Sequence, residues 1–162
     1  MINLANLNAI KKHDKSNVYG SINVLPDQIA QAWEETQRIN FPQDYKNCDN
    51  IVIAGMGCSL FNYYFAQALY AEYLKIPIVA ANSYELPGFV GSKTLFFASS
   101  YSGTTEEAIK CAQEAKLKKA RITGVTSGAT LGNFLLSNNY PSYVFQPKYN
   151  PEIGRASCRE RV

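Results

Sequence analysis

The sequence predicts a three-layer α/β sandwich with a mostly parallel, five-stranded sheet, preceded by an N-terminal helical arm. Short apolar runs alternate with longer segments of helical composition between residues 51 and 145. Strands that are apolar on both faces are typical of a parallel sheet covered by helices on both sides. The chain has 162 residues, which is enough for one domain with a substantial core.

The N-terminal arm, residues 1–25, is polar with scattered leucine and isoleucine, and we expect it to be irregular or helical. A helix is expected to begin at Pro26, because proline is favoured in the first helical turn. Ile29 and Trp33 give this helix one apolar side. It is expected to end near Asn40, ahead of the next proline.

The rest of the chain alternates between strands and helices. The first strand, Ile51-Val52-Ile53-Ala54, is typical of the others, because each is a near-continuous apolar run. Strands are expected at residues 51–54, 78–80, 95–98, 121–125 and 143–145. Helices are expected at residues 60–74, 104–118 and 130–136.

The composition excludes several function classes. With 46% hydrophobic and 18% charged residues, the chain is typical of globular proteins. It contains no run of about 18 apolar residues that would predict a membrane span, and its first residues lack the apolar centre of a secretion signal. The cysteines and the single histidine, His13, show no metal-ligand spacing, so we expect no metal site and reduced thiols in a cytoplasmic protein.

The net charge of +3 is weak. Lysines and an arginine cluster near one predicted helix end, where cations are favoured by the helix dipole. We therefore expect no nucleic-acid partner. The cluster consists of Lys116, Lys118, Lys119 and Arg121.

The tail, EIGRASCRERV at residues 152–162, differs from the rest of the chain, with three arginines and no apolar periodicity. The same string is the in-frame translation of a common DNA-sequencing adapter. We expect a non-native tail, which includes Cys158, and a natural chain that continues beyond Pro151. The expected organisation is an arm and helix at 1–45, an α/β domain at 46–151 and this tail.

Two loops follow predicted strands and enter predicted helices: GMGCS at residues 55–59 and SSYSGTT at residues 99–105. Such loops lie at the carboxyl ends of parallel strands, where open sheets bind ligands. Backbone N–H groups at a helix N-terminus favour an anion, and hydroxyls can surround phosphate oxygens without a positive side chain. A small phosphorylated metabolite is therefore the expected ligand. The hydroxyls belong to Ser59, Ser100, Ser102, Thr104 and Thr105.

Helix capping, a dinucleotide fold and a P-loop are the other interpretations of these loops. Thr104 or Thr105, followed by Glu107, also fits an ordinary helix-capping arrangement. The Gly-x-Gly after the first strand suggests a dinucleotide fold, but the sixth position is Leu60, and residues 78–83 contain no acid. A P-loop is excluded because no Gly-Lys-Ser/Thr sequence is present.

These motifs resemble a known family. GMGxS and SYSGxTEE, each after a strand, are similar to the sugar isomerase (SIS) domain, a flavodoxin-like phosphosugar-binding fold. "DKSNVYGSINVLPDQIAQAWEE", "IVIAGMGCS", "SSYSGTTEEAI" and "GVTSGATL" together resemble the bifunctional phosphoglucose/phosphomannose isomerases of the phosphoglucose isomerase superfamily. The resemblance covers nearly all of residues 15–151 and implies the N-terminal part of such an enzyme.

The resemblance implies a sugar-phosphate substrate (glucose-6-phosphate, mannose-6-phosphate or fructose-6-phosphate), no cofactor and no metal. It also implies a homodimer for the full-length protein. Cys58 stands where the family usually has glycine, and we assign it no catalytic role. The phosphate contacts carried over by motif are Gly57, Ser59, Ser100, Ser102 and Thr105. The sugar-proximal positions are Cys58, Tyr101, Gly103 and Thr104.

The implied chemistry is proton transfer between C1 and C2 through a cis-enediol, which needs a base and an oxyanion stabiliser. The family supplies these from an arginine after the fifth strand and from a second SIS domain, so we expect the catalytic residues beyond Pro151. Arg155 belongs to the tail and is not this arginine. On this interpretation, the chain binds the sugar phosphate but is inactive alone. The residues given no catalytic role are His13, Glu85, Glu106 and Glu107.

Two alternatives stay open: a SIS-type sugar-phosphate-binding regulatory module, and another SIS phosphosugar isomerase. A regulator would normally carry a helical DNA-binding domain. Residues 1–49 hold one clear helix and no basic recognition helix, which disfavours the regulator.

Overall fold

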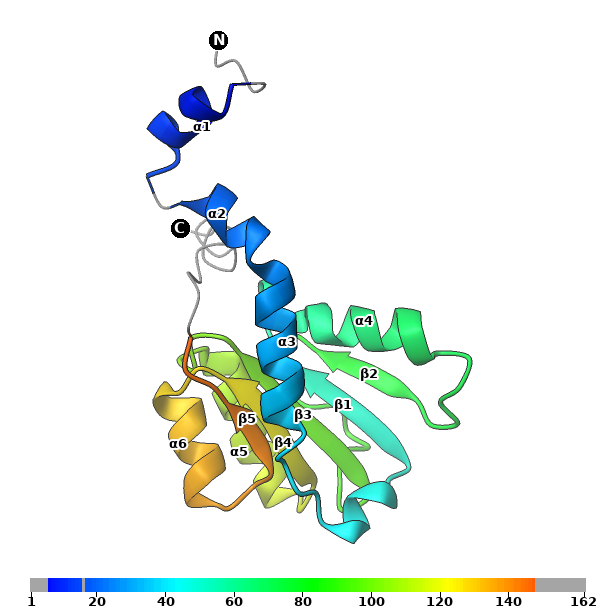
Figure 1. Cartoon of the computed structure of the whole chain (residues 1–162). Helices are drawn as coiled ribbons and strands as arrows, with labels where there is room; N and C mark the ends of the chain where they lie inside the picture. Colours follow the sequence, from blue (N-terminus) through cyan, green and yellow to red (C-terminus); the bar gives the residue numbers. More distant parts are fainter. Residues whose placement is uncertain (1–5, 16, 148–162) are drawn as a thin grey trace. The chain divides into compact units, whose positions relative to one another are not determined.

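The computed structural model describes residues 6–15 and 17–147, and the tail with Cys158 lies outside them. A compact unit of residues 39–146 contains the sheet, and a second unit contains the N-terminal helices. Those helices are α1 (Leu7–His13), α2 (Val18–Asn23) and α3 (Leu25–Thr36) (Figure 1). Across the described ranges, no helix has both the length and the apolar character needed to cross a bilayer.

The helix α3 contains Pro26 in its first turn, as expected. It ends at Thr36 rather than near Asn40. The Thr36 hydroxyl donates to the carbonyl oxygens of Ala32 (2.7 Å) and Trp33 (3.1 Å). The Gln37 N–H also donates to the Trp33 carbonyl, at 3.3 Å, so the hydroxyl shares this acceptor with the backbone in the last turn of the helix.

Five parallel strands form the sheet, in the order β2-β1-β3-β4-β5. Val52, Phe96 and Ile122 stand side by side across its three central strands. From β1 the chain passes to β2 on one side, and it later continues through β3, β4 and β5 on the other side. The strand order therefore reverses between β1 and β3. This is the switch point, where such sheets bind ligands. The strands are β1 (Asn50–Ala54), β2 (Ile78–Ala81), β3 (Thr94–Ser100), β4 (Arg121–Thr126) and β5 (Ser142–Val144).

Helices cover both faces of the sheet, which confirms the predicted fold class. The crossover from β1 to β2 and the crossovers from β3 to β4 and from β4 to β5 run in opposite directions from the switch point. Because each crossover is right-handed, the first places α4 (Phe61–Tyr70) on one face. The other two crossovers place α5 (Glu106–Leu117) and α6 (Ala129–Ser137) on the opposite face (Figure 1). The connection from β2 to β3, residues 82–93, crosses the α5 face without a helix.

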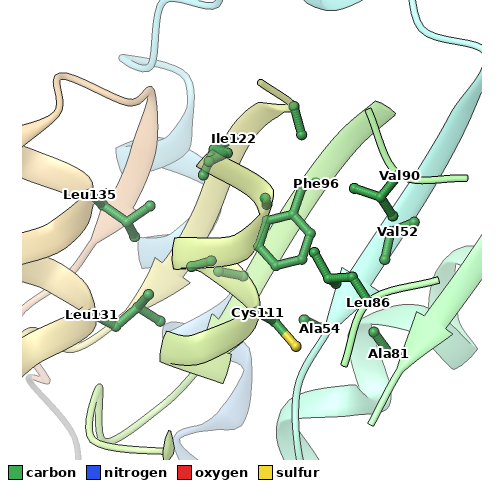
Figure 2. Close-up of a cluster of buried hydrophobic side chains, with 14 residues drawn as sticks. Val52, Ala54, Ala81, Leu86, Val90, Phe96, Cys111, Ile122, Leu131 and Leu135 are labelled. Atoms are coloured by element: carbon green, nitrogen blue, oxygen red, sulfur yellow. The ribbon is translucent and has the colours of Figure 1, made fainter. Parts of the chain in front are cut away.

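The core lies between the sheet and α5, with Phe96 at its centre and fully buried (Figure 2). Small side chains on the buried face of α5 allow the helix to pack closely on the strands. Leu131 and Leu135 close the core from α6, and Leu86 and Val90 close it from the β2–β3 connection. The buried residues of α5 are Ala108, Cys111, Ala112 and Ala115.

Several element boundaries differ from the sequence predictions. The helix expected at residues 60–74 is a 3-10 helix, Gly57–Leu60, followed by α4, which ends at Tyr70. The Tyr70 carbonyl accepts from the N–H groups of Tyr73 and Leu74, which closes a turn there. The helix expected at 104–118 begins two residues later, at Glu106, because Thr105 is extended.

The third strand is longer than predicted. It continues through Ser99 and Ser100, which pair with Val125 and Thr126 of β4. The predicted strand ends at Ala98 because the apolar run ends there. Both serines are buried, so the sheet itself carries the first part of the hydroxyl-rich segment.

The buried thiol of Cys111 predicts a pH effect on stability. Burial, reinforced by Glu114, raises the pKa of this thiol from 9.0 to about 11. The folded state therefore keeps a proton that the unfolded state loses above about pH 9, so stability falls as the pH rises toward 11. Thermal or urea unfolding should show that this thiol contributes a loss of about 1 kcal/mol between about pH 8 and pH 10, so that the total loss is smaller in Cys111→Ala.

The control for this titration is Val52→Ala, which truncates another fully buried side chain that carries no proton. It should lower stability equally at both pH values. A Cys111→Ala variant with the same pH slope as the wild type would contradict the assignment.

Candidate functional site

The two hydroxyl-bearing loops meet at the switch point. The loop after β1 and the segment at the end of β3 leave neighbouring strands at the same edge. The Tyr101 N–H donates to the Ser59 Oγ at 3.3 Å, which joins them directly. A Cβ at Gly55 would lie 3.0 Å from the Ser59 carbonyl oxygen and 3.1 Å from the Ser99 carbonyl oxygen, so glycine permits this close approach.

Asn62, in the first turn of α4, strengthens the junction. Its Nδ2 donates to the Ser99 Oγ at 2.8 Å and lies 3.4 Å from the Ser59 carbonyl oxygen. Asn62 is not among the site residues expected from the sequence. The available signal was its position three residues after Ser59, on the same side of a helix start.

The segment after β3 is shaped by paired hydroxyls. Ser100 Oγ and Thr105 Oγ1 are 2.8 Å apart, and Ser100 Oγ accepts from the Gly103 N–H at 3.1 Å. Ser102 Oγ lies 3.0 Å from Thr104 Oγ1 and accepts from the Thr104 N–H at 3.3 Å. Ser100 is fully buried, whereas Ser102 and Thr104 are exposed. The first pair therefore holds the loop's shape, and the second faces solvent.

The capping interpretation does not describe Thr105. It is the N-cap residue of α5, but its side chain makes no cap hydrogen bond to that helix. The nearby charge is negative: Glu106 and Glu107 lie in the first turn of α5. Both raise the pKa of the Tyr84 phenol, Glu107 most strongly, and the Tyr84 hydroxyl donates to Glu106 at 3.4 Å.

The remaining predicted positions have different surroundings. Gly57 is exposed and left-handed (φ +54°), with open space where a Cβ would stand. Cys58 is half-buried in the 3-10 helix. The Tyr101 ring packs edge-on against Phe145, with 5.6 Å between centroids. Gly103 is buried and also left-handed, with φ +69°.

A third loop, between β4 and α6, also belongs to this edge. Ser127 donates to the Tyr101 carbonyl from both its N–H (3.0 Å) and its Oγ (2.7 Å). Ser127 lies within "GVTSGATL", one of the motifs on which the family resemblance rests, and the sequence assigned no site role to that motif. Its contact with Tyr101 joins segments 26 positions apart, which no local pattern reveals.

The arrangement offers N–H and O–H donors and no cationic side chain, because residues 55–62 and 99–105 contain no lysine or arginine. Among residues 6–15 and 17–147, no group of three His, Cys, Asp or Glu side chains is arranged to hold a metal ion. A cavity of about 310 Å³ lies elsewhere, between the end of α4 and the start of β2 near Ile78. The chemistry available at the loops is hydrogen bonding to an anion.

Comparison with solved structures shows the fold. A Clostridium difficile 630 protein, solved as a candidate phosphosugar isomerase, has a TM-score of 0.60 at 17% identity, covering 78% of this chain and 36% of that one. The Vibrio vulnificus NanR protein, complexed with ManNAc-6P, has a TM-score of 0.57 at 21% identity, covering 85% of this chain and 52% of that one.

Comparison with curated sequences shows the family, although no model of a known protein family matches the chain. A bifunctional phosphoglucose/phosphomannose isomerase of Caldicellulosiruptor bescii is 38% identical over 117 residues, 72% of this chain and 34% of the relative. The Thermoplasma volcanium enzyme of the same name is 40% identical over 97 residues, 58% of this chain and 31% of the relative. The chain thus spans about a third of the length of the curated relatives it matches, and it belongs to the bifunctional phosphoglucose/phosphomannose isomerase family.

Proposed function

We propose that this chain binds the phosphate group of a hexose phosphate. It serves as the phosphate-holding part of an enzyme that interconverts glucose-6-phosphate and mannose-6-phosphate with fructose-6-phosphate. Family membership supports the reaction class. The observation that carries the proposal is the contact between Tyr101 N–H and Ser59 Oγ, which places two donor-rich loops together at the switch point.

The hydrogen-bond pattern supports specific phosphate contacts. Ser59 Oγ accepts from Tyr101 and so keeps its own proton for a ligand. The Ser102 side chain is exposed in the segment that follows β3. We propose that Ser59, Ser102 and Thr105 donate to phosphate oxygens. In this scheme Ser100 supports the phosphate contact indirectly: its hydroxyl donates to Thr105 Oγ1 and leaves the Thr105 proton for the phosphate, while Gly57 lets the backbone approach the sugar.

The proposed isomerisation proceeds through a cis-enediol and requires a base at the sugar carbon and a group that stabilises the developing oxyanion. We propose that these groups come from a part of the longer enzyme that follows Pro151. On this view the present chain binds sugar phosphates without interconverting them. The proposed domain organisation is an arm and helix at residues 1–45 and a phosphosugar-binding domain at residues 46–151.

A second candidate is a sugar-phosphate-binding module without isomerase chemistry. It is favoured by the fold shared with the NanR protein, whose structure holds ManNAc-6P. The two candidates differ in ligand preference. The isomerase predicts that fructose-6-phosphate competes effectively with ManNAc-6P for this chain, whereas the second candidate predicts a preference for the N-acetylated sugar.

Titration with fructose-6-phosphate tests the proposed site. In ¹⁵N-edited NMR spectra, we expect concentration-dependent shifts of the Ser100, Ser102 and Thr105 amides, and no such shifts with unphosphorylated fructose. Ser102→Ala should weaken binding by about tenfold or more, because a hydrogen bond to a charged group contributes about 1.5–3 kcal/mol.

The matched control is Ser92→Ala, which removes an exposed serine before the start of β3. It should bind like the wild type. A folded sample whose loop amides do not respond to millimolar fructose-6-phosphate would contradict the proposed phosphate site.

A further inference from the structure

The β4–α6 loop holds the hydroxyl-rich loop through one carbonyl group. The Tyr101 carbonyl accepts the Ser127 N–H at 3.0 Å and the Ser127 Oγ at 2.7 Å. A carbonyl oxygen has two lone pairs, so Ser127 supplies a donor for each of them. Two donors from one residue fix the orientation of this carbonyl more tightly than a single hydrogen bond does.

The orientation of this carbonyl determines that of the next amide. The peptide between Tyr101 and Ser102 is planar and trans, since the described residues include no cis peptide bond. The Ser102 N–H therefore points in the direction opposite to the Tyr101 carbonyl, away from Ser127. Ser127 thus determines where the Ser102 N–H is directed.

The β4–α6 loop is itself held in place. Thr126 Oγ1 accepts from the Gly128 N–H at 3.2 Å and donates to the Gly128 carbonyl at 3.2 Å. The Leu131 N–H at the start of α6 donates to the Gly103 carbonyl at 2.9 Å. Tyr101 and Gly103, on either side of Ser102, are therefore both bonded to the same neighbouring segment.

We propose that Ser127 is a positioning residue for the phosphate site: by holding the Tyr101 carbonyl, it directs the Ser102 N–H toward the bound phosphate. This inference rests on the proposed function. Ser127 does not itself contact the ligand in this scheme. The Ser127 hydroxyl keeps the Ser102 N–H in its ligand-bound orientation before the ligand arrives. This lowers the free energy that binding would otherwise spend on ordering the loop.

Two substitutions at this position isolate the hydroxyl. Ser127→Ala keeps the backbone hydrogen bond to Tyr101 and removes the 2.7 Å hydroxyl bond. Ser127→Thr keeps a hydroxyl in the same place and should restore the wild-type behaviour. The matched control is Ser137→Ala at the end of α6, where another serine hydroxyl donates to a backbone carbonyl, that of Phe134.

The first measurement is affinity for fructose-6-phosphate, followed by amide NMR. We expect Ser127→Ala to bind about threefold to tenfold more weakly, the effect of one neutral hydrogen bond. The ligand-induced shift of the Ser102 amide should shrink with it. Ser127→Thr and Ser137→Ala should stay within about twofold of the wild type. Wild-type affinity in Ser127→Ala, or equal losses in Ser127→Ala and Ser127→Thr, would overturn the proposal.

The second measurement is amide hydrogen exchange without ligand. The Gly103 and Leu131 amides should exchange faster in Ser127→Ala, while the core amide of Ile122 keeps its wild-type rate. If the wild type binds fructose-6-phosphate but the Gly103 and Leu131 amides of Ser127→Ala exchange at the wild-type rate, the positioning role is overturned and the proposed function is not. Faster exchange in a protein that binds no sugar phosphate shows that the proposed function has failed, and the positioning role fails with it.

Discussion

Gly103→Ala is expected to destabilise the protein by roughly 2–5 kcal/mol and to abolish sugar-phosphate binding. A Cβ at this position would lie 1.9 Å from the Gly128 carbonyl oxygen and 2.8 Å from its carbonyl carbon. These are backbone atoms, which cannot rotate away as a side chain can. The residue also has φ +69°, which costs a non-glycine residue about 1–2 kcal/mol. Thermal unfolding by circular dichroism should show a Tm lower by roughly 10 °C.

Substitutions at two other glycines separate the cost of the positive φ from the cost of the Cβ contact with Gly128. Gly57 has φ +54° and open space around its Cβ position, so Gly57→Ala should show the backbone cost alone, about 1 kcal/mol. Gly88 has neither a positive φ nor a neighbour within 4 Å, so Gly88→Ala should be neutral or slightly stabilising. If Gly103→Ala were no less stable than Gly57→Ala, the close contact with Gly128 would be disproved.

Phe96→Ala is expected to cost about 3–5 kcal/mol of unfolding free energy. Phe96 is fully buried in the middle of β3, between Val52 on β1 and Ile122 on β4. Removing its ring leaves a cavity that the surrounding strands and α5 cannot fill without breaking their own packing. Urea unfolding should show a lower midpoint with an unchanged slope, since the surface exposed on unfolding stays nearly the same.

Phe96→Leu keeps this experiment interpretable if the alanine variant fails to fold, because it should lose clearly less stability. Leu117→Ala is the matched control: this side chain, at the end of α5, is 83% exposed. Its substitution should stay within about 0.5 kcal/mol of the wild type. A loss below about 1 kcal/mol for Phe96→Ala would contradict the central place of this ring in the core.

β1 and β3 were predictable because their apolar side chains follow one another without alternating polar residues. Val52 lies in the run Ile-Val-Ile-Ala and Phe96 in the run Leu-Phe-Phe-Ala, and the absence of a period-two pattern there indicates a sheet covered on both sides. Helix ends were less predictable. α3 ends at Thr36, ahead of the end near Asn40 that the next proline predicted, because a proline excludes helix only close to itself and does not fix where the helix ends before it.

The candidate site was predictable in its residues and less so in its internal contacts. The hydroxyls of Ser100 and Thr105 were identified because they follow an apolar strand and precede a helix. Their mutual hydrogen bond was not, because a hydroxyl before a helix more often caps it. Asn62 and Ser127 were missed for a different reason: their partners, Ser99 and Tyr101, lie at the end of β3 and just after it, and the order of strands in the sheet brings these distant segments together.

The contact between Ser59 and Tyr101 spans 42 positions of the chain. It exists only when β1 and β3 lie side by side, a pairing that needs a long loop to close first. The site is therefore a feature of the assembled sheet and not of any local peptide. An isolated fragment containing either loop lacks the geometry, and partial unfolding that separates these two strands removes the site along with the centre of the sheet.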